Sequence, residues 1–332
     1  AWLDVTQLPP TSALTCTRCS FVMTFLCQLY APVSTADVGH GDAYHRCMYM
    51  FICQNTVCVA GGRCVTCLSP VLRRPHSITP PPTKAKDAVE LGARLLPPPP
   101  GRRAPCTVCS LPASNRCKAC GKATYCCRAH QVLHWKRGHK AVCSAGGDAA
   151  GAPLPVPTAV AAKVAFPEFD MEVEPEPTKE ERLAGLGVGF LPAAELLEAS
   201  AADADADEDA AIAKLQQSEL PGGDVSDDPM HRAFARRVAC RPAQCLRYRL
   251  WRDEALLPVS QTPPPPEAGS APPCPLCGAA RRFEFQVLPQ VLSYVTTTTT
   301  QSLDFGTLAV YSCTASCGGS GGGYHQEHVW VQ

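Results

Sequence analysis

The sequence has few of the residues from which a large hydrophobic core is built. Aromatic residues make up only 7% of the 332 residues, while 33 residues are prolines. The longest apolar stretch, FVMTFLCQLYAPV, contains Gln28 and has about a dozen residues, whereas a membrane-spanning helix needs about 20. We therefore expect no membrane helix, and small modules that are held together by something other than one large core.

The sequence also lacks the motifs that usually mark a catalytic site. No His-Glu-x2-His pattern is present, and the glycine-rich run at 318–323 lacks the strand-to-helix context of a phosphate-binding loop. Serine, histidine and acidic residues occur, but not in a recognisable nucleophile setting. We therefore expect no catalytic residues and a protein that is not an enzyme.

Acidic side chains are missing from one part of the chain and concentrated in another. Residues 101–143 carry nine lysines and arginines and no acid, whereas residues 168–230 carry 18 acids against three bases. Residues 231–252 are basic again, with seven arginines. The formal net charge of zero therefore hides alternating blocks, which suit interaction surfaces better than one uniform fold.

Cysteine, by contrast, is abundant, with 21 residues in the chain. Many of them form C-x2-C pairs accompanied by histidine, which is typical of zinc sites in a reducing compartment rather than of disulfides. We therefore expect zinc to hold the modules together. Because the chain begins with Ala-Trp, we also expect residues to be missing before Ala1.

Proline-rich and acidic stretches divide the chain into five predicted parts. They are an N-terminal zinc-ribbon half at 1–75, a Pro-rich linker at 76–104, a finger at 105–143, an acidic linker at 144–230, and a C-terminal domain with a second ribbon at 231–332. The proline runs exclude helix and central strand, and the acidic linker has too few large apolar side chains to offset ordering entropy. Within it, FPEFD at 166–170 is expected to be a docking segment, with a solvated turn as the alternative.

The two ends of the chain carry a repeated pattern. In each copy a C-x2-C pair is followed by a glutamine nine residues on, a β-prone run and two further cysteines. The inner cysteines are 34 residues apart in the first copy and 36 in the second. This is the layout of a zinc ribbon, in which two cysteine-bearing turns share one tetrahedral ion. The cysteines concerned are Cys16, Cys19, Cys53 and Cys58 near the start, and Cys274, Cys277, Cys313 and Cys317 near the end.

The finger offers four further pairs of metal donors, enough for two sites. A C-x2-C pair places two thiolates on one turn, and residues four apart lie on one face of a helix, so either spacing can chelate an ion. Spacing alone does not tell whether the pairs combine in sequence or interleave. The pairs are Cys106 with Cys109, Cys117 with Cys120, Cys126 with His130, and His139 with Cys143.

The order of these pairs, with Trp135 before the last one, resembles a MYND zinc finger. In that family the pairs interleave as a cross-brace, and zinc accepts His130 where the usual pattern has cysteine. The resemblance implies that Cys127 and His134 are bystanders. It implies one site of Cys106, Cys109, Cys126 and His130, and a second of Cys117, Cys120, His139 and Cys143.

Nearly the whole chain outside the linkers resembles the programmed cell death protein 2 family. The resemblance rests on segments in the expected order: AWL at the start, the region from Cys16 to Cys47, the finger, FPEFD, QCLRY at 244–248, the region from Cys274 to Gln290, AVYSC, and EHVWVQ at the end. It implies a small zinc-stabilised α+β fold, with duplicated β-rich zinc-ribbon halves, an inserted MYND finger and disordered linkers.

The resemblance also sorts the remaining cysteines. Cys47 is expected to be packed in a strand rather than to bind metal. Two other pairs stand where the family has ordinary residues, so their role is left open. They are Cys64 with Cys67 and Cys240 with Cys245.

The resemblance implies a binding function. The function implied is that of a dedicated, co-translational chaperone, which captures a newly made small-subunit ribosomal protein in the cytoplasm during ribosome biogenesis, with a nuclear location as a further possibility. Zinc would be structural, with two ions in the finger and one in each ribbon, because four protein ligands can fill every site. An acidic segment suits a basic client.

Two other functions compete with the chaperone. In the first, the chain is an adaptor in transcription or apoptosis whose finger binds Pro-rich peptides beside Trp135. In the second, the basic finger and residues 231–252 bind nucleic acid, but the finger does not match the Cys-Cys-His-His pattern of DNA-reading fingers, so we do not expect a nucleic-acid partner.

Overall fold

A computed structural model of the chain describes residues 9–34, 45–59, 65–72, 105–144, 164–176, 228–252, 256–261, 267, 269–295, 303–318 and 324–332. The linker expected at 76–104, most of the one expected at 144–230, and Cys64 lie outside the described residues. The chain divides into two compact units, the first made of 1–169, 245–256 and 266–332, and the second of 170–244 and 257–265. Among the described helices, none has the length and apolarity needed to cross a membrane.

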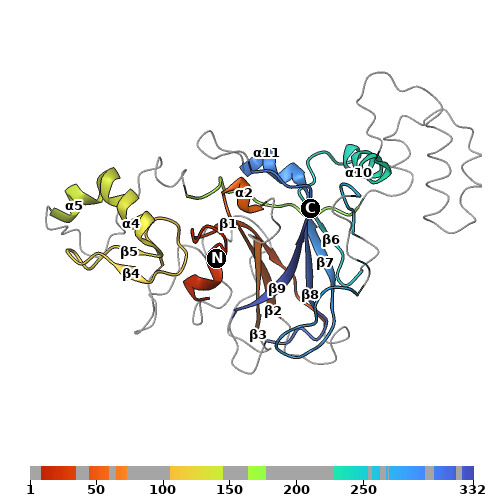
Figure 1. Cartoon of the computed structure of the whole chain (residues 1–332), viewed down its shortest axis with the longest axis horizontal. Helices are drawn as coiled ribbons and strands as arrows, with labels where there is room; N and C mark the ends of the chain where they lie inside the picture. Colours follow the sequence, from red (N-terminus) through yellow and green to blue (C-terminus); the bar gives the residue numbers. More distant parts are fainter. Residues whose placement is uncertain are drawn as a thin grey trace, which may run out of the picture. The chain divides into compact units, whose positions relative to one another are not determined.

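One antiparallel sheet of seven strands dominates the first unit (Figure 1). Its order is β1-β2-β3-β9-β8-β7-β6, so β3 from the N-terminal part pairs with β9 from the end of the chain. The sheet is curled, so that residues next to its two edge strands meet. Val33, which follows the edge strand β1, packs against Leu250 and Trp251, which follow the other edge strand, β6. The strands are β1 (Thr24–Tyr30), β2 (His45–Ile52), β3 (Val65–Leu72), β6 (Leu246–Tyr248), β7 (Arg281–Val287), β8 (Leu308–Cys313) and β9 (Tyr324–Val331).

The N-terminal and C-terminal strands are paired in the same register. In β1 and β2, Phe25 lies opposite Phe51, and in β7 and β8, Phe283 lies opposite Tyr311. The register shifts directly after Phe25 in one pair and directly after Phe283 in the other. A bulge of this kind bends the strand and strengthens its twist, so both halves bend at corresponding positions.

The core lies on both faces of the sheet. In β2, alternate side chains point to opposite faces, so Met48 and Met50 join one apolar cluster while Tyr49 and Phe51 join another. The first cluster also includes residues of β7 and β8, such as Phe285. Its apolar residues therefore come from both ends of the chain, which gives the two halves a shared interior.

A buried ion pair lies inside this shared core. The guanidinium of Arg46 in β2 donates from Nη1 to Glu284 Oε2 at 2.9 Å and from Nη2 to Oε1, and its Nε donates to the carbonyl oxygen of Ala31 at 3.0 Å. Arg46 is 1% exposed and Glu284 0% exposed. A second buried pair joins Arg281 to Glu327, with 3.4 Å between Nε and Oε2. Paired in this way, the charges avoid the high cost of isolated burial.

The remaining elements of the first unit are short and mostly carry or support the cysteine groups. They are the 3-10 helices η1 (Thr11–Leu14) and η5 (Pro289–Val291), the helices α2 (Thr56–Val59) and α11 (Leu292–Val295), and the finger elements β4 (Asn115–Arg116), β5 (Thr124–Tyr125), α4 (Arg128–His134), η3 (Trp135–His139) and α5 (Lys140–Ser144).

The described part of the second unit contains one longer helix, α10 (Pro229–Ala239). Asp228 caps its N-terminus, accepting from the backbone N–H of Met230 at 2.8 Å, and Pro229 occupies the first helical position. Hydrogen bonds from the backbone N–H of Gln261 and from neighbouring groups lower the pKa of Asp228 to about 2. Local capping therefore fixes where this helix begins.

Removing one member of the buried ion pair should destabilise the sheet strongly. We expect Arg46→Met to lower the free energy of unfolding by about 3–5 kcal/mol, because Glu284 is left buried without its partner. The double variant Arg46→Met/Glu284→Leu should recover most of this loss. Urea unfolding of the metal-loaded chain, followed by tryptophan fluorescence, measures both.

The more exposed ion pair between Arg237 and Glu176 provides a matched control. Their side chains are 14% and 19% exposed, so Arg237→Met should cost at most about 1 kcal/mol. If Arg46→Met were as mild as this control, the buried pair would not hold the halves together.

Candidate metal centres

The structure brings the sixteen candidate donors together in four groups of four. In each group the donor atoms all lie within 4.8 Å of one another. The groups contain the donors that the repeat and the resemblance assigned to four sites. They are Cys16, Cys19, Cys53 and Cys58; Cys106, Cys109, Cys126 and His130; Cys117, Cys120, His139 and Cys143; and Cys274, Cys277, Cys313 and Cys317.

Four C-x2-C turns build these groups with one backbone geometry. In each, the N–H of the fourth residue after the first cysteine donates to that cysteine's carbonyl oxygen at 2.8 to 2.9 Å. This fourth residue has a positive φ, which favours glycine and costs other residues about 1–2 kcal/mol. The four residues are Ser20, Ser110, Gly121 and Gly278, with φ of 59°, 59°, 65° and 74°.

The donor spacing fits zinc. Thiolate sulfurs about 2.3 Å from a tetrahedral ion lie about 3.8 Å from one another. The measured separations are 3.6 Å for Cys109 and Cys126 and 4.0 Å for Cys117 and Cys143. Calcium and magnesium prefer oxygen ligands, so a set of sulfur and imidazole donors selects a softer metal.

In the finger the pairs interleave, as the resemblance implied. Cys106 and Cys109 share their group with Cys126, which directly follows β5, and with His130, which lies on α4. The His130 Nδ1 atom lies 3.1 Å from Cys126 Sγ. The pair of Cys126 and His130 thus joins the first C-x2-C turn of the finger, and the pair of His139 and Cys143 joins the second.

The second finger group depends on a break in the helix. His139 lies on η3 and Cys143 on α5. The helical conformation that begins with α4 is interrupted just before His139, at Gly138, whose φ is 148°. His139 is 2% exposed, and its Nε2 lies 3.7 Å from Cys120 Sγ. The break therefore lets His139 face the C-x2-C turn.

Sequence reasoning missed the side chains that position His139. His134, expected to be a bystander, is 1% exposed, and its ring stacks on that of His139 with centroids 5.0 Å apart. Its Nδ1 lies 3.1 Å from the hydroxyl of Tyr125, which is also fully buried. His134 lies five residues before His139, and residues five apart do not share a face of a regular helix. The sequence therefore contains no sign that the two rings stack, which the helix break at Gly138 allows.

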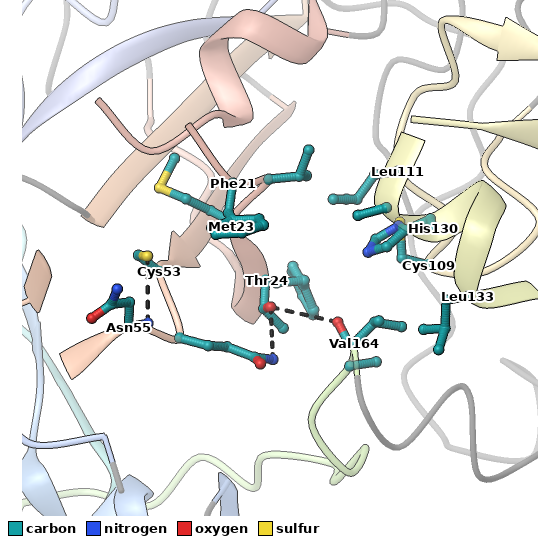
Figure 2. A pocket seen from close by; sticks show the side chains of 15 residues that line it. Phe21, Met23, Thr24, Cys53, Asn55, Cys109, Leu111, His130, Leu133 and Val164 are labelled. Atoms are coloured by element: carbon teal, nitrogen blue, oxygen red, sulfur yellow. Dashed lines mark hydrogen bonds between the residues drawn. The ribbon is translucent and has the colours of Figure 1, made fainter. Parts of the chain in front are cut away.

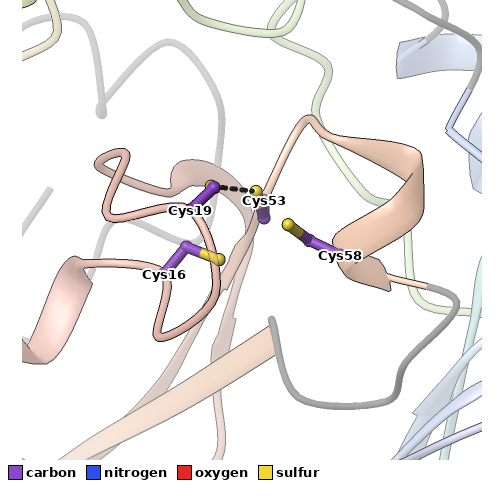
Figure 3. Close-up of side chains that lie close together, drawn as sticks. All are labelled: Cys16, Cys19, Cys53 and Cys58. Carbon is purple, nitrogen blue, oxygen red and sulfur yellow. Dashed lines mark hydrogen bonds between the residues drawn. The ribbon is translucent and has the colours of Figure 1, made fainter.

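The two groups on the sheet have the same architecture. Figure 3 shows the first, in which Cys16 and Cys19 come from the turn before β1, Cys53 follows β2 and Cys58 lies on α2. Cys19 and Cys53 have sulfurs 3.5 Å apart. In the C-terminal group, the sulfurs of Cys274 and Cys317 and those of Cys277 and Cys313 are also 3.5 Å apart.

The thiols within a group influence one another's protons. Hydrogen bonds with Cys109 and Cys126 lower the pKa of Cys106, while hydrogen bonds with Cys106 and Cys109 raise the pKa of Cys126. Burial opposes the shift at Cys274, yet the backbone N–H groups of Leu276 and Cys277 help to lower its pKa to about 7. Binding of a divalent cation requires the thiols of a group to lose their protons.

The other described cysteines lie outside the four groups. Cys47 is 2% exposed and accepts a hydrogen bond from Gln28 Nε2 at 3.8 Å, in keeping with the expected packing role. Cys67 is 0% exposed in the apolar core. Cys127, Cys240 and Cys245 are half-buried.

An apolar pocket lies between the finger and the first cysteine turn. It has a volume of about 390 Å³, and Figure 2 shows Leu111 and Leu133 of the finger across from Phe21 and Met23. Val164 and Ala165, which follow the finger in the sequence, also line the pocket. The carbonyl oxygen of Val164 accepts a hydrogen bond from Thr24 Oγ1 at 3.5 Å. Three parts of the first unit therefore line one pocket.

The FPEFD segment is neither wholly docked nor wholly solvated. Phe166 is 7% exposed in the core cluster of the sheet. Phe169 is 61% exposed, and its ring contacts Tyr294 edge-on, with centroids 5.4 Å apart. The first aromatic residue therefore anchors the segment, and the second remains accessible.

A curled antiparallel sheet with two four-cysteine groups and an inserted cross-braced finger defines a zinc-finger protein. Family models match along the chain: the N-terminal domain of Programmed cell death protein 2 at residues 1–83, the MYND finger at 106–143, and the C-terminal domain of Programmed cell death protein 2 at 228–332. The chain belongs to the Programmed cell death protein 2 family, as predicted from the sequence.

Relatives cover the chain fully. Programmed cell death protein 2 of Bos taurus is 34% identical over 341 residues, covering 100% of this chain and 88% of that protein. The protein of the same name in Mus musculus is 32% identical over 353 residues, with the same coverage. Programmed cell death protein 2-like of Homo sapiens is 38% identical over 93 residues, or 28% of this chain and 25% of that protein. No solved structure gives a significant match.

Adjacent cysteines provide a sharp test of the donor assignment. We expect Cys126→Ser to lose one metal ion per chain, because Cys126 faces its group, and Cys127→Ser to retain all of them. Elemental analysis of the purified variants measures this directly. Equal metal content in the two variants, or a loss only in Cys127→Ser, would contradict the assignment.

Proposed function

We propose that this chain is a non-enzymatic zinc protein that acts as a dedicated chaperone of a small-subunit ribosomal protein. It would capture its client during or soon after synthesis in the cytoplasm, with a nuclear location as an extension, and so serve ribosome biogenesis. The chemistry of one exposed acidic and apolar segment, described below, carries this proposal, and the four closed donor groups support its non-enzymatic part.

The absence of catalysis is supported by how the donor groups are filled. Each described group has four protein donors, which is typical of structural zinc, whereas a catalytic zinc keeps a position for water or substrate. We infer four zinc ions per chain, two in the finger and one beside each end of the sheet. Such ions hold small modules in a fixed shape for binding.

The client class is supported by residues 170–176, which alternate in chemistry without forming helix or strand. Asp170, Glu172 and Glu174 are exposed, and between them Met171 is 46% and Val173 93% exposed. Such a segment can neutralise a basic chain and cover its apolar side chains at the same time. Ribosomal proteins are basic and need both kinds of cover before they meet RNA.

We further infer that the two sheet halves are duplicated zinc ribbons. The matched register, the bulge at corresponding positions and the identical C-x2-C turns support a common origin. In the sheet order, β1-β2-β3 meets β9-β8-β7, so each half is an antiparallel meander and the third strands pair with each other. A duplicated three-strand unit gives this arrangement when the third strand of one copy pairs with the third strand of the other.

An adaptor that binds Pro-rich peptides through the finger is the second candidate. Its support is the exposure of Trp135 and Val132, at 37% and 40%, next to the basic surface of the finger. The finger also contributes Leu111 and Leu133 to the apolar pocket that it shares with the first cysteine turn. This role would be compatible with client capture, whereas RNA binding has no comparable support.

Charge reversal should separate client capture from the alternatives. We expect wild-type protein purified from cells to carry one small-subunit ribosomal protein, stable to ribonuclease, and the triple variant Asp170→Lys/Glu172→Lys/Glu174→Lys to lose it. The control Asp304→Lys changes an equally exposed acid elsewhere and should keep it. Quantitative mass spectrometry measures the ratio of client to bait.

Two outcomes would contradict the chaperone. One is a partner that leaves after ribonuclease treatment, which indicates RNA. The other is a partner that depends only on residues 105–143 and carries Pro-rich segments, which indicates the adaptor.

Removing the metal should unfold the finger. Structural zinc contributes on the order of 10–16 kcal/mol per site in small peptides, more than the net stability of about 5–15 kcal/mol of a typical domain. We expect about four equivalents of zinc in the purified chain, matching the four donor groups, and loss of far-UV helical signal with a strong chelator. A signal unchanged by the chelator would contradict this.

A further inference from the structure

The two donor groups on the sheet differ in their access to solvent. In the N-terminal group, Cys16, Cys53 and Cys58 are buried and Cys19 is half-buried. In the C-terminal group, by contrast, Cys277 is exposed. Among the sixteen donor residues of the four groups, Cys277 is the one that is exposed.

The two groups also differ in the residue before the second cysteine of the turn. In the N-terminal group this residue is Arg18, whose Nη1 donates to the backbone carbonyl oxygen of Val57. Val57 directly precedes Cys58, so the guanidinium connects the C-x2-C turn to the segment that carries Cys58. We call each four-donor group on the sheet a cage.

The C-terminal turn cannot make this link. The residue before Cys277 is Leu276, which has no hydrogen-bond donor on its side chain and is 54% exposed. All four residues of 275–278 are exposed. In the N-terminal turn Thr17, Arg18 and Ser20 are exposed as well, whereas Cys19 is half-buried, so the two turns differ in exposure at their second cysteine.

We propose that Cys277 is a peroxide-reactive thiolate, and that the C-terminal cage is where oxidation releases the metal from this protein. The inference goes beyond client binding and rests only on metal loading of the cage. The thiolate, not the thiol, is the nucleophile, and coordination to a metal keeps the sulfur deprotonated. Access to solvent then decides which coordinated sulfur reacts first.

The chemistry requires only a hydroperoxide, ROOH. The sulfur of Cys277 attacks the terminal hydroxyl oxygen of ROOH, an S–O bond forms, the O–O bond breaks, and the alkoxide leaves and takes up a proton to become ROH. The Cys313 sulfur, 3.5 Å away, then attacks the sulfenic acid, and hydroxide leaves and becomes water. Two thiolates are oxidised to one disulfide, the peroxide is reduced, and the cage keeps two of its four donors.

The test uses the full-length chain, whose metal content is first measured by elemental analysis so that an unloaded preparation is recognised. Hydrogen peroxide is added in equimolar amount, zinc release is followed with a chromogenic chelator, and the modified cysteines are mapped by mass spectrometry after alkylation. We expect one equivalent of zinc to leave in the first phase, together with a disulfide that contains Cys277. Dithiothreitol and zinc should restore the cage.

Two variants that leave every donor in place test the cause. We expect Leu276→Arg to slow the first phase several-fold, because it supplies the missing guanidinium, and Arg18→Leu to add a second fast equivalent from the N-terminal cage. Oxidation that starts at Cys19 or in the finger, or a first disulfide without Cys277, overturns the proposal. Unchanged rates in both variants overturn the assigned role of Arg18.

Discussion

The main constraint on the fold is that two charges from opposite ends of the chain are buried and neither can be buried without the other. Arg46 lies in β2 and Glu284 in β7, and both are enclosed by the sheet. A single buried charge is strongly unfavourable, while the bidentate pair with a further bond to Ala31 is tolerated. The final packing of the N-terminal strands therefore includes the carboxylate that the C-terminal strands supply. This makes the two halves one folding unit despite a long intervening sequence.

The cysteine groups are continuous with the apolar core. The second apolar cluster contains cysteines of the N-terminal group, such as Cys16 and Cys53. Ligation therefore fixes the same residues that pack beneath the sheet. Every described group holds four protein donors, which is the number that a tetrahedral structural zinc site takes.

Much of the site and part of the fold could be predicted from the sequence. Cysteine and histidine spacing is a local signal, so candidate donors could be named, and the coarse expectation of cysteine clusters suited to zinc together with a MYND finger is confirmed. The joining of the halves could not be predicted, because the partner of Arg46 lies 238 residues away and no periodicity connects them. Nor could the stacking of His134 on His139, which requires the helix break at Gly138.

The comparison of the two halves shows how a shared framework acquires different surfaces. Backbone hydrogen bonds and a positive φ specify each C-x2-C turn, and these requirements leave the residue before the second cysteine free to vary. Arg18 uses that freedom to link the N-terminal cage, and Leu276 leaves the C-terminal cage open. The position before the second cysteine has no role in the turn itself and differs between the two groups. Stability and reactivity can therefore change independently in a protein whose donor sets and strand register are the same at both ends.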